Sequence, residues 1–513
     1  MPTSGHGSGP ATSDQSHRRH VRELIAEASQ ALGGEFPDHD AVTIIGSPRT
    51  LPSRLPVSAL AQATVAVVGL AASELGAVRT GTGPRRREPL TIDSGAVAAA
   101  FTSERHLRLD GRPQVGMDPL SAFLPAADGW VRLHGNYPHH RARLRAALGI
   151  ADTTADPTAA VTAAVATLTA AEVEDRVVAH GGVAAAVRDP AGWERHPQGR
   201  ALAGLPLMRM QHWGDEQASR GSRRPTGETG LPAAGIRLLD LTRVIAGPVG
   251  TRILAFLGAD VLRVDSPRLP EIPAQHLDTG PGKRSTFLDL GRPTDRRMFE
   301  ELVASADVVV TGYRPGALDR FGLSPQALHE RHPGIVVATL NAWGPTGPWA
   351  RRRGFDSLVQ AATSIATTEA GGDPGSTRPG VLPAQALDHA TGYLTAAAVL
   401  RALTLRHRES GSWHAQLSLA QTATWLLARA KAGEDAGGST AAAGTTDTST
   451  KASTDTLTSP ADVRPVDATP WLDTIDSHAG RLTYVLPPLR LDGGPRTWSH
   501  PPRSLGASSP TWL

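Results

Sequence analysis

Residues 236–265, IRLLDLTRVIAGPVGTRILAFLGADVLRVD, begin and end with short apolar runs. IRLLDL and DVLRVD are predicted strands, and the segment between them is predicted to be a loop followed by a helix. The alternation continues downstream with a strand at STFLDL, a helix at TDRRMFEELVASA, a strand at DVVVTG, a helix at SPQALHERHP and a strand at GIVVATLNAW. Strands and helices that alternate at this spacing predict βαβ units and a parallel sheet. The strands are Val/Ile/Leu runs without polar alternation, which is typical of strands covered by helices on both faces. The predicted class is therefore α/β, with a Rossmann-like open parallel sheet and helices on both faces.

The chain has 513 residues, a length that favours two or more domains. Polar or Gly/Ser/Thr/Ala-rich stretches indicate where the linkers lie. We predict a disordered leader at 1–20, a helical region at 21–119, a smaller α+β domain at 120–213, a linker at 214–235, the Rossmann-like domain at 236–431, a low-complexity linker at 432–468, and a C-terminal strand within 469–513 that returns to the sheet.

A faint internal repeat relates residues 58–100 to residues 357–398. Each copy carries a small-residue helix, a Gly/Pro-rich loop and an aspartate that opens a second Ala-rich helix. The two aspartates are Asp93 and Asp388. Chance similarity between Ala-rich helices is the alternative explanation. Because the first copy lacks the strands that would hold a nucleotide, we expect Asp93 to be structural.

Composition narrows the classes of function. The chain has no cysteine, which excludes disulfides, thiolate metal sites and cysteine nucleophiles. The formal net charge of +3 gives little support for nucleic-acid binding. No apolar run of membrane-spanning length is found, and the polar N-terminus lacks the apolar core of a secretion signal. No histidine spacing typical of a metal site occurs. We therefore expect a cytoplasmic protein without a metal or a redox cofactor.

The loops after the predicted strands carry many basic residues. The glycines of the first loop, Gly247, Gly250 and Gly258, do not have the G-x-G-x-x-G spacing, which argues against a dinucleotide site. Ligands of open α/β sheets bind at this edge, and the planar fork of arginine suits phosphates. A phosphate-binding edge and a solvated basic rim both remain open for these residues: Lys283, Arg284, Arg314, Arg320, Arg351, Arg352 and Arg353.

Residues 385–393, QALDHATGY, place an acidic residue at the start of an apolar helix. Asp388 has two interpretations. It can cap the helix, a role worth about 0.5–2 kcal/mol, or it can act as a covalent nucleophile if the resulting oxyanion is stabilised. Its neighbour His389 points in a different direction on a helix, so the two cannot form a dyad.

Five ordered segments together resemble the family III CoA-transferases, also called the CaiB/BaiF family, which includes formyl-CoA transferase, carnitine CoA-transferase and methylacyl-CoA racemase. They are GIRLLDLTRVIAGPVGTRILAFLGADVLRVD, GKRSTFLDL, ADVVVTGYRPGALDRFGL, LNAWGPTGPWARRRGFDSLVQA and DHATGYLTAAAVLRAL, spread over about residues 235–427. Residues 55–212 resemble the later part of a family member, and 478–505 its C-terminal strand. The chain therefore looks like a fused or rearranged long form, in which 21–119 is a half-copy of the active-site region.

The resemblance implies that Asp388 is the catalytic aspartate. It would attack an acyl-CoA thioester, form a mixed anhydride and then an aspartyl-CoA thioester, and pass CoA to a carboxylic acid. CoA is a substrate in this scheme, and no other cofactor is needed. The resemblance also implies a homodimer as an assembly to expect. The implied CoA contacts are Ala246, Leu288, Gly312, Tyr313, Arg314, Arg320 and Arg353.

Departures from the family pattern separate the alternatives. The racemase branch carries a histidine where this chain has Phe355, and phenylalanine cannot transfer a proton. This disfavours the third alternative, a 2-methylacyl-CoA epimerase. Ile245 replaces a glutamine of some transferases and Ser266 a CoA-binding arginine, so a non-catalytic CoA-binding or scaffold subunit is the second alternative.

Overall fold

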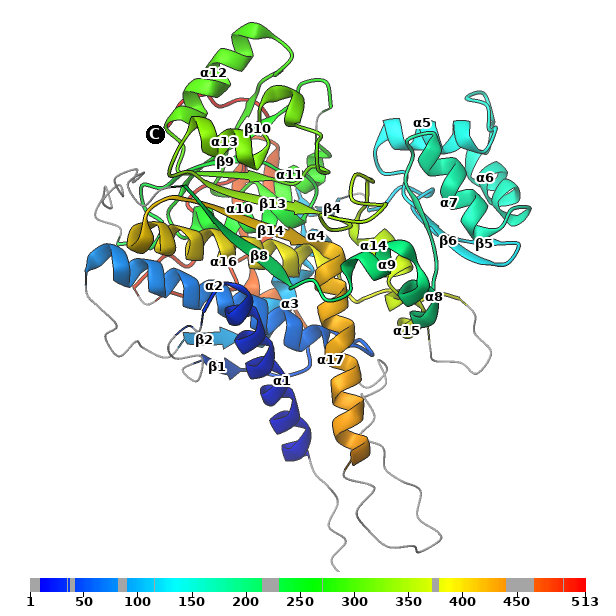
Figure 1. The fold of residues 1–513 in the computed structure, drawn as a ribbon, viewed down its shortest axis with the longest axis horizontal. Helices are drawn as coiled ribbons and strands as arrows, with labels where there is room; N and C mark the ends of the chain where they lie inside the picture. The colour runs from blue at the N-terminus through cyan, green and yellow to red at the C-terminus, as the bar shows by residue number, and fades with distance from the viewer. Residues whose placement is uncertain are drawn as a thin grey trace, which may run out of the picture.

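The computed structural model describes residues 10–34, 36, 42–81, 90–114, 116–214, 230–269, 271–370, 378–439, 466–491 and 493–513. A seven-stranded sheet lies at its centre (Figure 1). Six neighbouring strands pair in parallel, and the strand at one edge pairs antiparallel. In spatial order the strands are β11 (Arg284–Phe287), β10 (Asp260–Asp265), β9 (Arg237–Leu241), β12 (Val308–Thr311), β13 (Val336–Asn341), β14 (Ser412–Ser418) and β8 (Met208–Trp213). The predicted α/β class with a mostly parallel sheet is confirmed.

Helices cover both faces of this sheet, as the apolar strands predict. Successive residues of one strand face two different cores: Leu238 packs in the larger core and Leu239 in the smaller one. The smaller core is closed by α12 (Pro293–Ala304) and α13 (Pro325–Arg331), and the larger by α10 (Ala246–Phe256) and α16 (Ala386–Glu409). Strands buried on both sides carry mostly apolar residues, which explains their Val/Ile/Leu runs.

Helices α10 and α16 touch backbone to backbone at two glycines. A Cβ atom added at Gly392 would lie 2.4 Å from the carbonyl oxygen of Ala246, and one at Gly250 would lie 2.6 Å from the carbonyl oxygen of Gly392. Only glycine permits this approach, since real Cβ contacts are longer. The crossing brings the start of α10 against the first turns of α16, where Asp388 lies.

We expect Gly392→Ala to destabilise the fold by about 1–3 kcal/mol, because the added methyl group forces the two helices apart. The matched control is Gly76→Ala in α2 (Val57–Thr80), where the new Cβ would meet only Pro232 at 3.9 Å. That change should be neutral or stabilising by up to about 1 kcal/mol, since alanine favours helix over glycine. Urea unfolding midpoints measure both. Equal midpoints for the two variants would contradict the close crossing.

The N-terminal helix is longer than the sequence predicts. Residues 1–20 were expected to be a disordered leader, but α1 (Pro10–Ala31) begins within them, and residues 1–9 lie outside the described part. The apolar face that includes Val21 extends back one turn to His17, which is buried and hydrogen-bonds Gln62 of α2 over 2.8 Å. Burial against α2 therefore orders a stretch whose composition suggests disorder.

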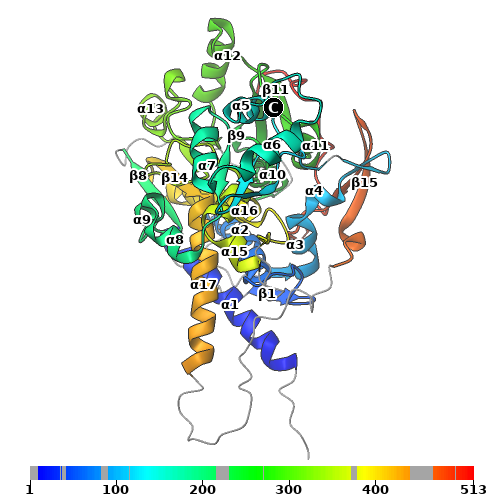
Figure 2. The same cartoon turned by 90° about the vertical axis from the view of Figure 1, so that its right-hand side faces the viewer.

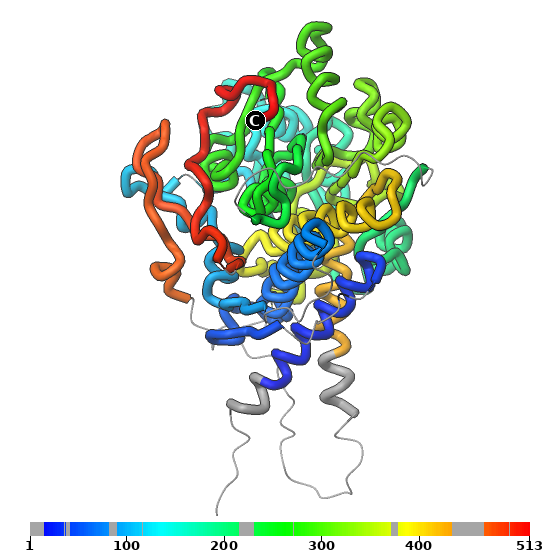
Figure 3. The backbone as a smooth tube through the Cα atoms, turned by 90° about the vertical axis from the view of Figure 1, so that its left-hand side faces the viewer, coloured from blue at the N-terminus to red at the C-terminus, as the bar shows by residue number. Residues whose placement is uncertain are grey.

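Helix α2 joins the N-terminal region to the rest of the chain. It packs along α16, as Figure 1 shows, and Figure 3 shows the blue N-terminal helices beside the gold C-terminal end of α16. The other elements of this region are β1 (Val42–Ile45), β2 (Leu90–Asp93), α3 (Ser94–Phe101) and α4 (Ser103–His106), with β1 and β2 paired in parallel. Among the described helices, α2 alone is long and apolar enough to span a membrane, and most of that segment is buried inside the protein.

The smaller α+β unit is built around a three-stranded antiparallel sheet. Its elements are β5 (Phe123–Ala126), β6 (Gly129–Leu133), β7 (Ala184–Ala186), α5 (Pro138–Ala147), α6 (Pro157–Ala166) and α7 (Ala170–Ala179). It has a core of its own, which includes Val131, Leu144 and Val173. The chain then passes through α8 (Pro190–Arg195) and α9 (Pro197–Leu202) into β8, at the edge of the central sheet.

The prediction that a C-terminal strand returns to the main sheet is wrong. β15 (Leu472–Ser477) and β16 (Gly480–Val485) form a separate four-stranded sheet with β3 (Arg108–Leu109) and β4 (Arg112–Pro113), at the right-hand edge of Figure 2. The described C-terminal residues pair with β11 through an isolated bridge, Thr286 to Ala507, and not through a strand, although side-chain hydrogen bonds such as that from Arg284 to the carbonyl oxygen of Thr511 add to this contact. Two residues connect β15 to β16, and such a local hairpin closes at a lower entropic cost than a distant pairing.

The remaining helices follow the central sheet. They are α11 (Pro273–Thr279), α14 (Asp356–Ala362), α15 (Ile365–Glu369) and α17 (Leu419–Ser439), and two short 3-10 helices span Asp319–Phe321 and Thr469–Trp471. Helix α17 extends into the predicted linker 432–468. Residues 440–465 of that linker lie outside the described residues.

Candidate active site

Asp388 does not cap α16. It is the third residue of the helix, whose N-cap is Gln385, and no side-chain capping bond is made there. The interpretation of Asp388 as an N-cap is therefore wrong. The residue is 6% exposed, and no hydrogen bond to its carboxylate is found among the described residues.

The carboxylate of Asp356 takes the capping role from another helix. Asp356 is the first residue of α14, and its Oδ2 accepts the backbone N–H of Asp388 over 2.9 Å. The N–H of Leu387 and the side-chain amide of Gln360 also donate to this carboxylate. The first N–H groups of a helix lack partners within the helix, so Asp356 satisfies a need that Asp388 would otherwise meet.

Two neighbouring carboxylates act on Asp388. Burial raises its pKa well above the ordinary value, and the charges of Asp356 and Glu104 raise it further. Burial also raises the pKa of Asp356, to about 6, although the hydrogen bonds from α16 and Gln360 oppose that shift. Hydrogen bonds to a carboxylate favour its charged form. These hydrogen bonds favour the charged form of Asp356, whereas none of the described residues donates to the carboxylate of Asp388.

His389 faces the N-terminal region. Its Nε2 lies 3.4 Å from Oε2 of Glu104 in α4, and its ring stacks on Phe101 with centroids 5.2 Å apart. Burial raises the pKa of Glu104, but the hydrogen bond and charge of His389 outweigh burial and lower it overall. His389 thus holds a charged Glu104 beside Asp388.

A cavity of about 670 Å³ opens next to these residues. One wall comes from the N-terminal region and the other from the loop after β9 and from α11. Asp388 is not among the lining residues, but its neighbours Gln385 and Glu104 are. The lining residues are Glu104, Arg105, Leu107, Arg108, Pro113, Gln114, Gly116, Met117, Asp118, Asn136, Val244, Ile245, Ile272, Pro273, Ala274, Gln275, Asp278, Thr279 and Gln385.

The loop between β9 and α10 is strained where it meets this cavity. Val244 has a φ of 70°, which is a genuine outlier for a β-branched residue. Its N–H donates to Oε2 of Glu271 over 2.9 Å, which holds the loop in this conformation. Residues in sparsely populated conformations tend to lie at functional sites. The strain places Val244 and Ile245 on the cavity wall.

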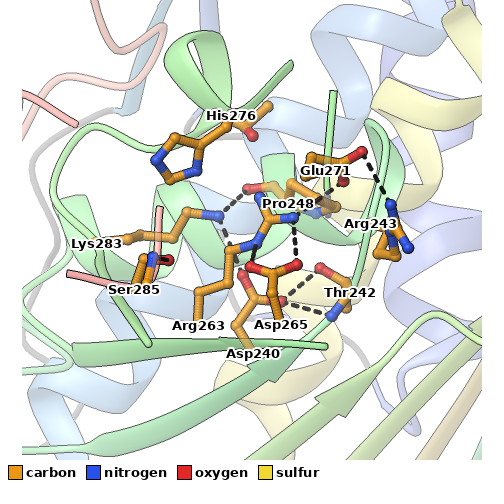
Figure 4. Close-up of polar contacts among 12 residues, drawn as sticks. Asp240, Thr242, Arg243, Pro248, Arg263, Asp265, Glu271, His276, Lys283 and Ser285 are labelled. Carbon is orange, nitrogen blue, oxygen red and sulfur yellow. Dashed lines mark hydrogen bonds and ion pairs between the residues drawn. The ribbon is translucent and has the colours of Figure 1, made fainter. Parts of the chain in front are cut away.

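Buried charges anchor this loop from below (Figure 4). Arg263 contacts Oδ2 of Asp265 over 2.7 Å and Oε2 of Glu271 over 3.0 Å, and the hydroxyl of Tyr137 donates to the other Glu271 oxygen over 2.5 Å. Lys283 lies 3.1 Å from Oδ2 of Asp240. These side chains belong to an internal network and not to a solvated rim.

For seven basic residues, including Lys283, the sequence left open whether they bind phosphate or form a solvated rim. Lys283 does neither, because it is buried in the internal network. Arg284 does neither as well, because it is buried against Asp260 at 2.8 Å. Arg352 contacts Glu174 over 3.0 Å. The residues that face outward are Arg314, Arg320 and Arg351, with Arg353 half-buried.

A family model described as CoA-transferase family III matches residues 233–458. An acyl-CoA transferase of Gibberella moniliformis is 31% identical over 400 residues, which cover 71% of this chain and 68% of the relative. The chain belongs to the family III CoA-transferases.

Other members of the family match over shorter stretches. A probable fatty acyl-CoA transferase of Mycobacterium tuberculosis is 32% identical over 217 residues, 40% of this chain and 54% of that protein. The alpha subunit of succinyl-CoA–L-malate CoA-transferase of Chloroflexus aurantiacus is 31% identical over 199 residues, 36% of this chain and 45% of that subunit. The matches thus span about half the length of these two relatives. A crystal structure of a CaiB/BaiF family protein from Brucella suis is 28% identical with a TM-score of 0.37, and the match covers 40% of this chain and 58% of that one.

The predicted CoA contacts of this family III chain lie at or near the carboxyl ends of its strands. Ala246 begins α10 after β9, Leu288 follows β11, and Gly312 follows β12. A Cβ at Gly312 would lie 3.4 Å from Cβ of Thr242, so the loops after β9 and β12 are close together. The structure therefore brings Gly312 near the β9 loop that leads into Ala246.

The polar members of that set are Tyr313, Arg314, Arg320 and Arg353. Burial raises the pKa of Tyr313 to about 12. Burial lowers the pKa of Arg353, and the charges of Arg314 and Arg143 lower it further. Arg320 is exposed and its guanidinium lies 4.6 Å from the ring centre of Phe321. No ion pair of Arg314, Arg320 or Arg353 occurs among the described residues.

Phe355 and Asp93, two positions considered in the sequence, make aromatic and capping contacts in the structure. Phe355 stacks on His134 with centroids 3.9 Å apart. Asp93 is the N-cap of α3, where it accepts the N–H groups of Gly95 and Ala96. Its other oxygen accepts the indole N–H of Trp471 over 3.3 Å. These contacts fit the structural role expected for Asp93.

Sequence reasoning missed Asp356 and Glu104. Asp356 directly follows Phe355 in the sequence, and an aspartate at the start of a predicted helix was a usable signal. Glu104 carried no signal, because it is 285 positions from His389. The cavity wall at 104–118 was likewise invisible in the sequence.

Proposed function

We propose that this chain transfers coenzyme A between an acyl-CoA thioester and a carboxylic acid, with Asp388 as the nucleophile. The observation that carries the proposal is the buried carboxylate of Asp388 in the first turn of α16, beside a cavity of about 670 Å³. This carboxylate makes no capping hydrogen bond, because Asp356 caps the helix in its place. A carboxylate without hydrogen-bond partners can direct its lone pairs at a bound carbonyl carbon. Membership of the CoA-transferase family supports CoA transfer in general.

The reaction needs no reactant beyond the acyl-CoA and the acceptor acid. An Asp388 oxygen attacks the thioester carbonyl, the C–S bond breaks, and CoA leaves as a thiolate. The thiolate then attacks the Asp388 carbonyl of the mixed anhydride and releases the first acid as a carboxylate, which leaves an aspartyl-CoA thioester. The acceptor carboxylate attacks that thioester and expels the thiolate. Attack of the thiolate on the acceptor acyl carbon then gives the new acyl-CoA and restores Asp388.

The surroundings of Asp388 suit these steps. The start of α16 carries positive partial charge, which favours the carboxylate and the oxyanions that form on it. Burial keeps water away from the anhydride, which water would hydrolyse. Phe355 offers no acid or base group at the position where an epimerase would need one.

A trapping experiment tests the proposal directly. The protein is incubated with a panel of acyl-CoAs and hydroxylamine, which converts an acylated carboxylate into a hydroxamate. Peptide mass spectrometry should find the hydroxamate on Asp388. A hydroxamate on another residue would exclude Asp388 as the nucleophile, and no adduct combined with measurable CoA binding would favour a non-catalytic CoA-binding subunit.

The pH profile of kcat/KM should have an acid limb whose pKa lies above the ordinary value of an aspartate. Only ionised Asp388 is a nucleophile, and its pKa lies well above the ordinary value because of burial, Asp356 and Glu104. The reactive fraction therefore increases as pH rises through that pKa, so kcat/KM should rise with pH on the acid side. Asp356→Asn removes one of the raising charges but keeps an oxygen for the Asp388 N–H. The acid limb should move to lower pH.

The matched control is Asp118→Asn. Asp118 lines the cavity but pairs with Arg141 and does not act on the pKa of Asp388. The acid limb of kcat/KM in the Asp118→Asn variant should lie at the same pH as in the unaltered protein. An acid limb that moves to higher pH in Asp356→Asn would contradict the electrostatic account of the site.

A further inference from the structure

Two backbone segments of the cavity wall are held by one carboxylate. Val244 and Ile272 both line the cavity, and each donates its backbone N–H to Glu271. The N–H of Val244 donates to Oε2 over 2.9 Å, and that of Ile272 donates to Oε1 over 2.9 Å. The two segments lead into α10 and α11. The orientation of the Glu271 carboxylate therefore fixes two parts of the wall at once.

Four described donors occupy this carboxylate. Besides the two backbone N–H groups, Arg263 donates to Oε2 over 3.0 Å (Figure 4), and the hydroxyl of Tyr137 donates to Oε1 over 2.5 Å. A carboxylate has about four lone-pair sites, so the set is complete. Burial raises the pKa of Glu271, but the charges of Arg263 and Arg243 outweigh burial and lower it overall. Glu271 is therefore a charged acceptor.

Tyr137 comes from a different part of the chain. It precedes α5 of the smaller α+β unit, outside the segment 233–458 that the family model matches, whereas Glu271 and its other described donors lie inside that segment. The side chain of Tyr137 is buried, and burial and the charge of Glu271 raise the pKa of its hydroxyl. The hydroxyl therefore keeps its proton and acts as a donor to Glu271.

The wall depends on this support at Val244. Among the described non-glycine residues with positive φ, Val244 alone is β-branched, and its φ is 70°. A β-branched residue avoids that conformation, so contacts with its surroundings must hold it there. Arg243 competes for the carboxylate, since its Nη2 lies 3.7 Å from Oε1 of Glu271. Without the Tyr137 hydroxyl the carboxylate is free to turn toward Arg243, and the N–H of Val244 loses its acceptor.

The same wall segment lies against the face of α16 that carries Asp388. Val244 is two residues before Ala246, and a Cβ added at Gly392 of α16 would lie 2.4 Å from the carbonyl oxygen of Ala246. Gly392 is four residues after Asp388, and residues four apart share one face of a helix. A shift of the loop at Val244 therefore changes the space in front of Asp388.

We propose that Tyr137 is a positioning residue for the reaction. Through Glu271 it keeps the cavity wall around Val244 in the shape that aligns a bound thioester with Asp388. The inference rests on the proposed function, because it adds to that site a residue from the smaller α+β unit. A misplacement of about 1 Å can cost on the order of 10²-fold in rate, so the position of the wall bears on the chemistry and not only on the fold.

One hydroxyl is removed in the first test. In Tyr137→Phe we expect kcat of CoA transfer to fall about 10- to 100-fold while KM for the acyl-CoA stays within about 2-fold, since a misplaced wall affects alignment more than binding. The matched control is Tyr484→Phe in β16, which removes a buried hydroxyl that contacts Thr497 over 2.7 Å, outside the cavity lining. An unchanged kcat in Tyr137→Phe, or an equal loss in both variants, would overturn the inference.

A second substitution separates positioning from a general loss of stability. Glycine adopts positive φ without a steric cost, so Val244→Gly makes the loop conformation independent of the Glu271 carboxylate. Adding Tyr137→Phe to Val244→Gly should therefore change kcat by no more than about 2-fold. A purely structural loss would persist, because glycine relieves strain only at position 244. The same loss of kcat with valine and with glycine at 244 would contradict the proposed role of Tyr137.

Hydrogen exchange keeps this inference apart from the proposed function. The backbone N–H groups of Val244 and Ile272 should exchange about 10-fold faster or more in Tyr137→Phe than in the unaltered protein, as expected when hydrogen bonds to a charged group are lost. If exchange rises there but the unaltered protein does not transfer CoA, the proposed function fails and the positioning of the wall stands. If the unaltered protein transfers CoA and exchange of both groups is unchanged in Tyr137→Phe, the function stands and the inference fails.

Discussion

Asp388→Asn should abolish CoA transfer without weakening the fold. We expect kcat/KM to fall on the order of 10⁴-fold or more, as when other covalent nucleophiles are removed, because an amide cannot form the anhydride. The fold should be at least as stable at pH 8. A carboxyl group whose folded pKa is raised contributes stability that is lost as pH rises through that pKa, and asparagine does not ionise. Coupled assay of CoA transfer and thermal unfolding midpoints measure the two effects.

The matched control for this variant is Asp93→Asn at the start of α3. Asparagine caps a helix about as well as aspartate, so both the cap of α3 and the activity should persist. Full activity in Asp388→Asn would remove Asp388 from the chemistry. Loss of activity in Asp93→Asn with unchanged stability would assign chemistry to the N-terminal region.

Lys283→Ala should cost about 3–5 kcal/mol of unfolding free energy, the usual result of removing one partner of a buried ion pair. The Nζ atom lies 3.1 Å from Asp240, 3.2 Å from the carbonyl oxygen of Pro248 and 3.0 Å from the hydroxyl of Thr251. The variant leaves the fully buried carboxylate of Asp240 without its ammonium partner, as Figure 4 makes visible. Guanidinium unfolding midpoints measure the loss.

The chain offers its own comparison in Lys431→Ala. Lys431 contacts Glu194 over 3.1 Å, but both side chains are about two-thirds exposed, at 66% and 65%. Exposed pairs are worth about 0–1 kcal/mol, so this variant should unfold within that range of the unaltered protein. Similar losses for the two lysines would contradict the assignment of Lys283 to the interior.

The sheet was predictable because its signal is local. Strands such as Val308–Thr311 consist mostly of apolar β-branched residues, and helices of ordinary amphipathic pattern separate them. A strand covered on both faces favours this composition. Asp388 was found for a similar reason: the residues around it form a short, ordered motif.

The C-terminal strands and the first helix were mispredicted because their structure depends on distant partners. Leu482 of β16 pairs with Leu109 of β3, more than 300 positions away. His17 is ordered by Gln62 of α2. Neither contact leaves a periodic pattern in the local sequence. Local propensity therefore predicted a strand in the central sheet and a disordered leader.

The class of fold, the family and the position of the proposed nucleophile follow from the sequence, since each is carried by contiguous residues. The environment of Asp388 follows only from the folded chain. Asp356 caps α16, so the carboxylate of Asp388 is not used as the helix cap. Glu104 comes to the site from the N-terminal half of the chain. The pKa of a buried carboxyl group is set by burial and by the charges around it. Those neighbours come from segments that meet only when the chain has folded.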